Sequence, residues 1–346
     1  MVRVAVCGGS GYTGGELLRI LSYHPEVIVT AVTSERSAGK TAGNIFPNIH
    51  KHSRLVYEQL KTADILDRAE LFFMALPHGK SQEAVDLFFR NGKKVIDLSA
   101  DYRLKDVKVY EGWYKTPHRF QETLKKAVYG LPELYRKKIS NANLIANPGC
   151  YPTGALLGVY PAIKNKLVDV TSIVIDSTSG TSGAGRSSDS AYSYCEVNEG
   201  FRAYAVATHR HTPEIEQEIS ALVHKNVRVN FTPHLAPFDR GILTTIYAKL
   251  TKKISTNRVF KIYKKTYSHE PFTRVLDEGK FPNVKSVRGT NLCEIGLIVN
   301  IRTNTLIIVT SIDNLMKGAS GQAVHNMNIM MGFDEKTALD SVAIYP

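Results

Sequence analysis

The sequence lacks the features that mark several specialised classes of protein. It contains four cysteines, Cys7, Cys150, Cys195 and Cys293. They form no C-x-x-C pair, which argues against a zinc site or a disulfide framework and fits a reducing cytoplasm. Apolar runs stay far below the roughly 20 residues that span a membrane. The chain opens directly on a strand-like segment, without a charged region and cleavage site, so we expect no secretory signal.

Acidic residues are fewer than basic ones, with 32 Asp and Glu against 44 Lys and Arg, a formal net charge of +12. Such a balance suits nucleic acid or small anions as partners. The lysines are scattered, however, and the sequence has no block of five or more like charges of the kind that forms an interaction arm. We therefore expect a small anionic substrate and no nucleic-acid or membrane partner.

A glycine motif follows the first predicted strand. The strand covers 2–7, and Gly9, Gly11 and Gly14 then fit G-x-G-x-x-G. A helical pattern over 12–22 and a second strand over 27–32 complete a dinucleotide-binding unit. The glycines permit a tight turn and close approach of a pyrophosphate to backbone N–H groups. The predicted cofactor contacts here are Gly9, Ser10, Gly11, Tyr12, Thr13 and Gly14.

The end of the second strand indicates which cofactor binds. An NAD enzyme usually places an acidic residue there to hold the ribose 2′-hydroxyl. Here Ser34, Arg36 and Ser37 favour the 2′-phosphate of NADP, whereas Glu35 leaves NAD open. We expect NADP(H).

Two later strand ends carry further candidates. The apolar run 71–76 reads as a strand buried on both faces, and it ends at Pro77 and His78. Both lie at the carboxyl edge of the predicted sheet and are expected to contact the cofactor, although His78 also fits a plain loop histidine. Strand 94–98 precedes Arg103, which we expect to contact a ligand.

The segment 147–153 places Cys150 at the predicted start of a helix. Pro152 suits a first helical turn, because its missing N–H would be unpaired there. Free N–H groups and the helix dipole favour an anion at that position, so the thiol ionises more easily and the thiolate is a nucleophile.

Two polar segments follow in the second half. A strand over 171–176 leads into the loop 177–186, whose Ser, Thr and Gly residues suit a phosphate or carboxylate. Thr212 and Pro213 then resemble the start of a helix, which puts His211 just ahead of it, where it can act as acid or base. His209 is the alternative. No third ligand accompanies these histidines at metal-binding spacing, so we expect no metal.

The remaining pattern is rich in β-branched strands, at 227–231, 242–250, 295–301 and 306–312. The last two flank a hairpin turn, whereas 233–241 looks too loop-like for a strand. We predict an α/β protein with a Rossmann-type NADP-binding domain over 1–148. An α+β catalytic and oligomerisation domain with a largely antiparallel sheet covers 149–314. A C-terminal helix over 315–346 completes the first domain.

A dinucleotide fold, an activated cysteine and a histidine together suggest acyl transfer coupled to hydride transfer. The motifs also resemble the N-acetyl-γ-glutamyl-phosphate reductase family of arginine biosynthesis. The matching segments are 8–17, 99–103, 147–153, 179–186, 209–214 and 317–322. His325 departs from the pattern, since the family commonly has glutamine there.

The resemblance implies that Cys150 carries a thioester, that His211 is the acid/base and that NADPH reduces an acyl phosphate to a semialdehyde. It implies a cytoplasmic homo-oligomer, a dimer or tetramer. Further cofactor contacts are expected from Ser179, Gly180, Gly183 and Asn314. The candidates for holding the substrate are Arg103, Arg186, Tyr204, Arg210 and Arg240, without individual roles.

Four alternatives stay open at this point. A sister reductase of lysine biosynthesis acts on an aminoadipyl phosphate attached to an acidic carrier protein, which the positive charge would suit. Aspartate-semialdehyde dehydrogenase shares the chemistry, but the segment 209–213 argues against it. An NADP-binding regulator would not need His211. A nucleic-acid-binding protein would need a clustered basic face.

Overall fold

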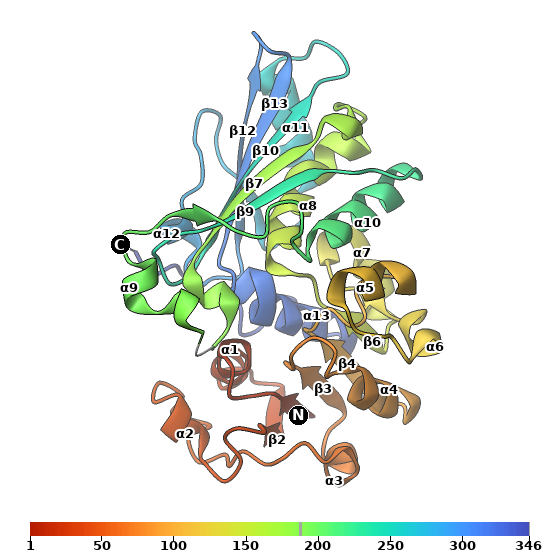
Figure 1. Cartoon of the computed structure of the whole chain (residues 1–346), viewed down its shortest axis with the longest axis vertical. Coiled ribbons are helices and arrows are strands. Elements are labelled where there is room, and N and C mark those ends of the chain that lie inside the picture. The colour runs from red at the N-terminus through yellow and green to blue at the C-terminus, as the bar shows by residue number, and fades with distance from the viewer. Residues whose placement is uncertain (187–188, 346) are drawn as a thin grey trace. The chain divides into compact units, whose positions relative to one another are not determined.

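The computed structural model describes residues 1–186 and 189–345, and the chain divides into two compact units (Figure 1). The first unit comprises Met1–Pro148 and Ala319–Ser341, and the second comprises Gly149–Gly318 and the residues from Val342. Each unit is built around one sheet. None of the helices in the described ranges has the length and apolarity that crossing a membrane requires.

The sheet of the first unit has six strands in the order β2-β1-β3-β4-β6-β5, all paired in parallel. The predicted strand over 2–7 is confirmed. Strand order reverses between β1 and β3, and ligands of such sheets bind at the carboxyl ends on either side of that point. The strands are β1 (Val2–Cys7), β2 (Val27–Thr33), β3 (Leu71–Met74), β4 (Lys94–Asp97), β5 (Val128–Tyr129) and β6 (Leu144–Ala146).

Helices connect these strands, as parallel pairing requires. The glycine loop enters α1, which buries Leu17, Leu18 and Leu21 along one side, as their spacing predicts. The helices before residue 148 are α1 (Tyr12–Leu21), α2 (Ala42–Ile45), α3 (Thr62–Ile65), the 3-10 turn η1 (Leu66–Arg68), α4 (Gln82–Arg90), α5 (Val107–Tyr114), α6 (Gln121–Leu124) and α7 (Pro132–Ser140).

A helix from the end of the chain completes the first unit. It is α13 (Gly321–Met331), much shorter than the predicted span 315–346, because Gly332 adopts a left-handed conformation (φ +73°) and ends it. The π-helical turn η5 (Met316–Ser320) precedes it. Burial raises the pKa of Glu335, but hydrogen bonds from His325 at 2.6 Å and from Arg136 outweigh it and lower that pKa to about 2. His325 therefore anchors the segment after α13.

The sheet of the second unit has seven strands in the order β11-β12-β13-β10-β7-β9-β8. Four neighbouring pairs are antiparallel, and the pairs β11–β12 and β7–β9 are parallel. The predicted hairpin of the last two strands is confirmed. The strands are β7 (Val174–Ser179), β8 (Arg202–Ala203), β9 (Asn230–Leu235), β10 (Ile242–Lys249), β11 (Thr273–Val275), β12 (Cys293–Asn300) and β13 (Thr305–Ile312).

Two predictions about this sheet were wrong. The strand expected over 171–176 starts at Val174, because Asp169 caps the 3-10 turn η2 (Val170–Ser172) through the Thr171 N–H. The segment expected to be loop after residue 232 continues β9 through Pro233. The Pro233 carbonyl accepts a hydrogen bond from the Tyr204 N–H. The Pro233 nitrogen faces this same side, away from β7, so the absence of an N–H on the proline removes no hydrogen bond from the pairing with β7.

Helix α8 (Cys150–Lys164) packs on one face of this sheet, with α10 (Thr212–Val223) and α11 (Thr256–Thr266) against it. Close approach of α8 depends on Gly154 and Gly158, whose added Cβ atoms would lie 3.0 Å from the Thr310 hydroxyl and 2.7 Å from Ile246. The other helices and helical turns are η3 (Thr181–Ala184), η4 (Ser190–Tyr192), α9 (Tyr194–Val197) and α12 (Val284–Val287).

Candidate active site

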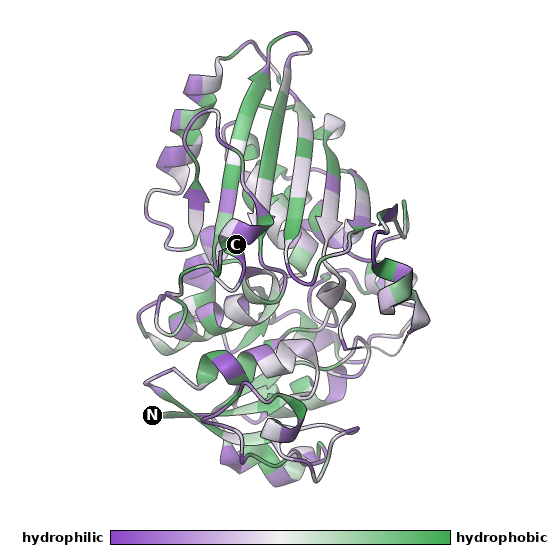
Figure 2. Cartoon of the chain, turned by 90° about the vertical axis from the view of Figure 1, so that its left-hand side faces the viewer, coloured by the Kyte–Doolittle hydropathy of each residue, from purple (hydrophilic) through white to green (hydrophobic). Residues whose placement is uncertain are grey.

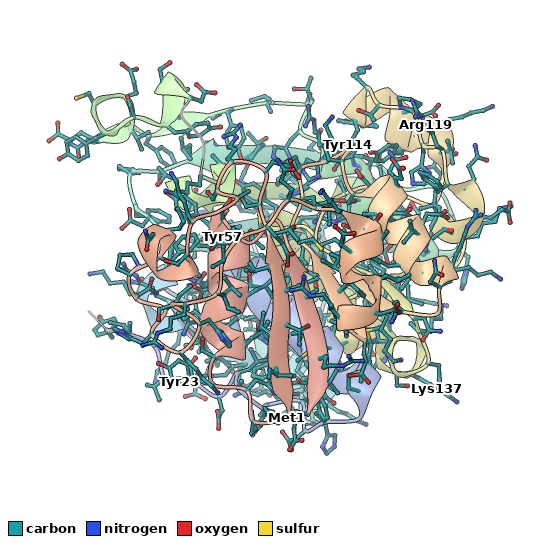
Figure 3. The ribbon with its side chains drawn as sticks, turned by 90° about the horizontal axis from the view of Figure 1, so that it is seen from below. Met1, Tyr23, Tyr57, Tyr114, Arg119 and Lys137 are labelled. Atoms are coloured by element: carbon teal, nitrogen blue, oxygen red, sulfur yellow. The ribbon has the colours of Figure 1, made fainter. Side chains whose placement is uncertain are left out.

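The glycine loop of the first unit is built so that only glycine fits at two positions. Gly8 has φ +86°, and a Cβ there would lie 2.2 Å from the Ala75 carbonyl oxygen. A Cβ on Gly14 would lie 2.5 Å from the Cα of Gly9. The Tyr57 hydroxyl (labelled in Figure 3) donates to the Gly9 carbonyl at 3.2 Å and fixes the loop. At Gly11 the nearest atom to an added Cβ is 3.9 Å away, which leaves space for a ligand against the backbone.

Hydroxyl groups gather where β1 and β2 end. The Ser10 and Ser34 hydroxyls are 2.6 Å apart, and the Ser34 hydroxyl also accepts the Ser37 N–H at 3.1 Å. Arg36 is exposed beside them. Glu35 instead accepts a hydrogen bond from the Leu60 N–H at 3.3 Å, which directs its carboxylate to the backbone. Two adjacent hydroxyls, with Ser37 and the exposed Arg36 close to them in the chain, suit a phosphate better than a ribose hydroxyl.

The loops after β3 and β4 are joined to each other. Asp101 accepts the Gly79 N–H at 2.7 Å and the Ser81 hydroxyl at 2.9 Å, and the His78 Nδ1 accepts the Ala100 N–H at 3.0 Å. His78 and the neighbouring Pro77 are exposed at this edge. Arg103 is different, because it is buried and donates to the carbonyls of Leu98 and Asn147 at 2.8 and 2.7 Å. These two hydrogen bonds hold the ends of β4 and β6 together.

In the second unit, Cys150 is the first residue of α8, as its sequence context predicts. Its N-cap is Gly149, and the thiol is half-buried. The helix dipole and the N–H groups of the first turn stabilise a negative charge at this place. Gly318 packs against the cysteine, since a Cβ added to it would lie 2.9 Å from the Cys150 Cβ.

This close packing gives a first prediction. In Gly318→Ala the new methyl group has to displace Cys150, and an error near 1 Å at a reacting atom costs up to about 100-fold in rate. We expect kcat to fall by roughly 10- to 100-fold with little change in NADPH affinity, measured by steady-state kinetics and cofactor titration. Gly112→Ala is the control, because an added Cβ there meets no atom within 4 Å and Gly112 lies inside the helix α5. Wild-type kcat in Gly318→Ala would contradict the tight packing.

His211 lies in a cluster of rings next to Cys150. It is the N-cap residue of α10, and its ring centroid is 5.8 Å from that of Tyr151 and 4.8 Å from that of His209. The hydroxyls of Tyr151 and Tyr204 are 2.8 Å apart. Burial raises the pKa of both tyrosines, so they stay protonated and serve as hydrogen-bonding groups.

The two histidines of the cluster differ in chemistry. Burial and the neighbouring Arg210 lower the pKa of His209 to about 4, and its Nδ1 accepts the His211 N–H at 3.0 Å. His209 is therefore neutral at pH 7, with its proton on Nε2. These constraints leave His211 as the better acid/base of the pair. Across residues 1–186 and 189–345, no group of three or more His, Cys, Asp or Glu residues is arranged to hold a metal ion.

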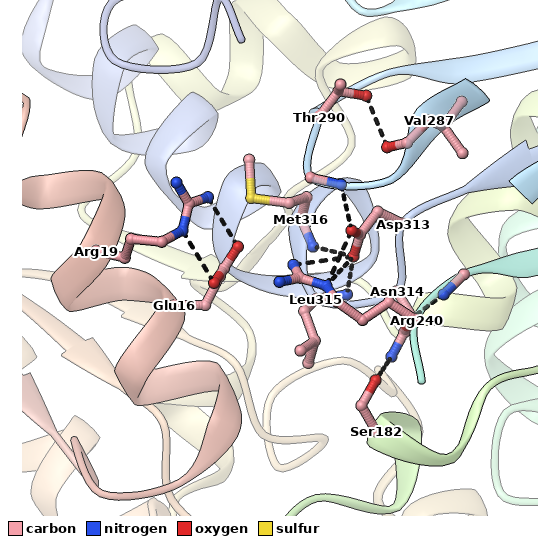
Figure 4. A network of polar contacts seen from close by, with 12 residues as sticks. Glu16, Arg19, Ser182, Arg240, Val287, Thr290, Asp313, Asn314, Leu315 and Met316 are labelled. Carbon is pink, nitrogen blue, oxygen red and sulfur yellow. Dashed lines mark hydrogen bonds and ion pairs between the residues drawn. The ribbon is translucent and has the colours of Figure 1, made fainter. Parts of the chain in front are cut away.

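The loop after β7 contacts the segment after β13. The Asn314 amide donates to the Ser182 hydroxyl at 2.9 Å and accepts the Gly241 N–H at 2.7 Å (Figure 4). An added Cβ on Gly183 would lie 3.0 Å from the Ser179 hydroxyl, and one on Gly180 would lie 2.6 Å from the Phe238 carbonyl. Four of the predicted cofactor residues, Ser179, Gly180, Gly183 and Asn314, thus come together in this unit.

The predicted substrate arginines have different surroundings. Arg240 is paired with the fully buried Asp313 at 3.0 Å, and Asp313 also accepts the N–H groups of Gly289 and Leu315 (Figure 4). Arg186 and Arg210 are exposed.

Sequence reasoning did not foresee the roles of Asp313, Tyr151 or the buried Glu214. An acid directly after a buried strand was the available signal for Asp313, whereas the contacts of the other two depend on tertiary structure.

Two family descriptions match the chain. Residues 3–142 match the semialdehyde dehydrogenase NAD binding domain, and residues 150–314 match the semialdehyde dehydrogenase dimerisation domain.

Full-length relatives carry a more specific name. The chain is 54% identical over 347 residues to the N-acetyl-gamma-glutamyl-phosphate reductase of Geotalea daltonii, with complete coverage of both. The corresponding values are 52% for the enzyme of Geobacter metallireducens and 47% over 346 residues for that of Desulforamulus reducens, again with complete coverage.

Solved structures show the same fold at low identity. Aspartate semialdehyde dehydrogenase II of Vibrio cholerae, complexed with ASA, has a TM-score of 0.74 at 16% identity, covering 96% of this chain and 98% of its own. The aspartate semialdehyde dehydrogenase of Candida albicans with NADP has a TM-score of 0.73 at 14% identity, covering 96% and 99%.

Proposed function

The chain belongs to the N-acetyl-γ-glutamyl-phosphate reductase family of semialdehyde dehydrogenases, and from this we propose that it reduces N-acetyl-L-glutamyl 5-phosphate to N-acetyl-L-glutamate 5-semialdehyde with NADPH, releasing phosphate, in arginine biosynthesis. The observation that carries the proposal is the position of Cys150 at the start of α8, beside the ring cluster that contains His211. A nucleophile and a proton carrier are the two groups that this reaction needs from the protein.

The first half of the proposed reaction is acyl transfer. The Cys150 thiolate attacks the acyl carbon of the substrate, a C–S bond forms and the C–O bond to phosphate breaks. Sulfur suits this role because it is both a good nucleophile and a good leaving group. His211 takes the thiol proton before the attack.

The second half is reduction of the thioester. NADPH, when bound, supplies the hydride. His211 moves a proton to and from the oxygen of the resulting hemithioacetal, which collapses by breaking the C–S bond. The semialdehyde leaves and Cys150 is again a thiolate. The arginine candidates and Tyr204 would hold the carboxylate and phosphate of the substrate.

The residues of the first unit fit NADP(H). The backbone at Gly11 is open for a pyrophosphate, and the hydroxyls of Ser10, Ser34 and Ser37 with Arg36 would hold the 2′-phosphate. A charge-assisted hydrogen bond contributes about 1.5–3 kcal/mol, a factor of roughly 10 to 100 in affinity.

We therefore expect Arg36→Ala to raise the KM for NADPH by about tenfold or more, because the 2′-phosphate loses its cation. The KM for NADH, which has no 2′-phosphate, should change little. Steady-state kinetics with both cofactors measures the difference. Arg119→Ala, which removes another exposed arginine of this unit, serves as the control. Equal effects of Arg36→Ala on the two cofactors would contradict the assignment.

A second copy of the chain is the proposed partner of the second unit. The strand register aligns four side chains on four neighbouring strands, on the face of its sheet turned away from α8. Figure 2 shows the ribbon of this sheet coloured by hydropathy. This apolar row consists of Val174, Tyr247, Ile307 and Ile298. Tyr247 and Ile298 are 39% and 41% exposed. Exposure of these apolar side chains to water is unfavourable in a single subunit. The match of this unit to a dimerisation domain supports self-association.

Ile298→Lys is accordingly expected to shift the protein toward a monomer at micromolar concentration, because it places a charge within the apolar row. Size-exclusion chromatography with light scattering measures the change in mass and also separates dimer from tetramer. Ile301→Lys is the control, since Ile301 lies outside the row and is 84% exposed. A monomeric wild-type protein would overturn the proposal.

The reaction is proposed to take place in the cytoplasm. The structure describes all four cysteines and joins none of them in a disulfide, which suits a reducing compartment.

The proposed function is tested by running the reaction backward, with protein, NADP, phosphate and N-acetylglutamate semialdehyde, and following the absorbance of NADPH. Phosphate-dependent formation of NADPH is the expected result. Activity only with a carrier-linked aminoadipate semialdehyde would assign the protein to lysine biosynthesis instead. Inactivity with both, despite NADP binding, would contradict the proposed function.

A further inference from the structure

A buried carboxylate joins the two helices that carry Cys150 and His211. Glu214 is the third residue of α10 and is 1% exposed. Its Oε1 accepts a hydrogen bond from the Gly149 N–H at 2.7 Å. Gly149 is the N-cap residue of α8, directly before Cys150.

The Gly149 residue is held on its other side as well. Its carbonyl accepts the Thr153 N–H at 3.1 Å and the Thr153 hydroxyl at 2.9 Å, and Thr153 is fully buried. Glu214 and Thr153 therefore fix the backbone on both sides of the Gly149 Cα. Because Gly149 directly precedes Cys150, this backbone fixes the position of the Cys150 Cα, from which the thiol side chain extends.

We propose that Glu214 is a positioning residue, which fixes Cys150 relative to His211, and that its negative charge disfavours ionisation of the Cys150 thiol. His211 is the N-cap residue of α10, so the Glu214 side chain crosses from the first turn of the helix that carries the imidazole to the head of the helix that carries the thiol. The inference rests on the proposed role of Cys150 as nucleophile.

The second part of the proposal follows from charge. A carboxylate at the N-terminus of α8 offsets part of the positive potential of the helix dipole, which otherwise favours the thiolate. Other titratable groups around the head of α8 in the described part of the chain include Tyr151, Tyr204, His209, His211 and, next to Gly318, Lys317. The two tyrosines and His209 are neutral at pH 7, so Glu214 is the group of this set that opposes ionisation of the thiol.

The charge is tested by the pH dependence of Cys150 alkylation with iodoacetamide, followed by mass spectrometry of the Cys150 peptide. Glu214→Gln keeps an oxygen that accepts the Gly149 N–H but removes the charge. We expect the midpoint of alkylation to fall by about one pH unit, the usual effect of one nearby charge. The exposed Cys195 of the same chain is an internal reference, and its midpoint should not move.

Glu216→Gln is the matched control on the same helix. Glu216 is also buried, but it binds Arg228 at 2.6 Å and the Val229 N–H at 3.2 Å, away from α8. This variant should leave the Cys150 midpoint at its wild-type value. An unchanged or higher midpoint in Glu214→Gln would overturn the proposal.

The positioning role is tested by kinetics. Glu214→Asp keeps the charge but is one methylene too short to reach Gly149, so kcat should fall by roughly 10- to 100-fold with KM little changed and no fall in the alkylation midpoint. Glu214→Gln should keep most of kcat. Wild-type kcat in Glu214→Asp would overturn the positioning role, and thermal melts confirm that each variant is folded. Because alkylation needs no substrate, failure of this inference is distinguishable from failure of the proposed reaction.

Discussion

Cys150→Ala is expected to abolish turnover, lowering kcat by on the order of 10⁴-fold or more, because the variant has no atom that can carry the acyl group. NADPH binding should persist, since the predicted cofactor contacts do not include the thiol. Stopped assays with high enzyme concentration measure the residual rate, and quenching of protein fluorescence measures the affinity for NADPH.

Two further variants sharpen this result. Cys150→Ser keeps the shape of the side chain with a far weaker nucleophile, so it should be almost as inactive as the alanine variant. Cys195→Ala removes an exposed thiol on α9 and should retain wild-type activity. Substantial turnover by Cys150→Ala would exclude covalent catalysis by this residue.

His211→Ala is expected to lower kcat by roughly 100-fold or more, the usual contribution of a general acid/base. The loss should be greatest where proton transfer limits the rate, so the dependence of kcat on pH should flatten. His211 lies at the N-cap of α10 and not in the core, so its loss should leave the fold intact. Steady-state kinetics from pH 6 to pH 9 measures both effects.

His209→Ala is the comparison that assigns the role to one histidine. Because the pKa of His209 is lowered to about 4, this imidazole is neutral throughout that range and does not change its charge there. Its replacement should leave the shape of the pH profile unchanged, with a smaller loss of kcat from the altered ring cluster. A larger loss for His209→Ala than for His211→Ala would reverse the assignment.

The sequence was informative where local pattern decides structure. The β-branched run before the glycine loop and the spacing of Leu17, Leu18 and Leu21 sufficed to predict β1 and α1. The proline in the first turn likewise predicted that α8 begins at Cys150. In each case the chemical signal lies within a few neighbouring residues.

The errors had local as well as distant causes. Pro233 is compatible with a strand because its nitrogen and its carbonyl both face Tyr204 and not β7. No local pattern in the sequence reveals this arrangement. The length of α13 depends on Gly332, a residue that looks like any other loop glycine until its left-handed conformation is seen.

Part of the candidate site was visible in the same limited way. Cys150 and His211 stand out in sequence because each lies two residues before a proline at a helix start. Glu214 was predicted as an ordinary acid of a first helical turn, but it reaches across to Gly149, 65 residues earlier in the chain. Pairings of this kind depend on how α8 and α10 pack, which the sequence does not state.

The most direct test of the central claim is to mix the enzyme with N-acetylglutamyl phosphate in the absence of NADPH. A thioester on Cys150 predicts a burst of about one phosphate per subunit and a matching increase in the mass of the Cys150 peptide. Phosphate release that requires NADPH, with an unmodified Cys150 peptide, would contradict covalent catalysis at this residue.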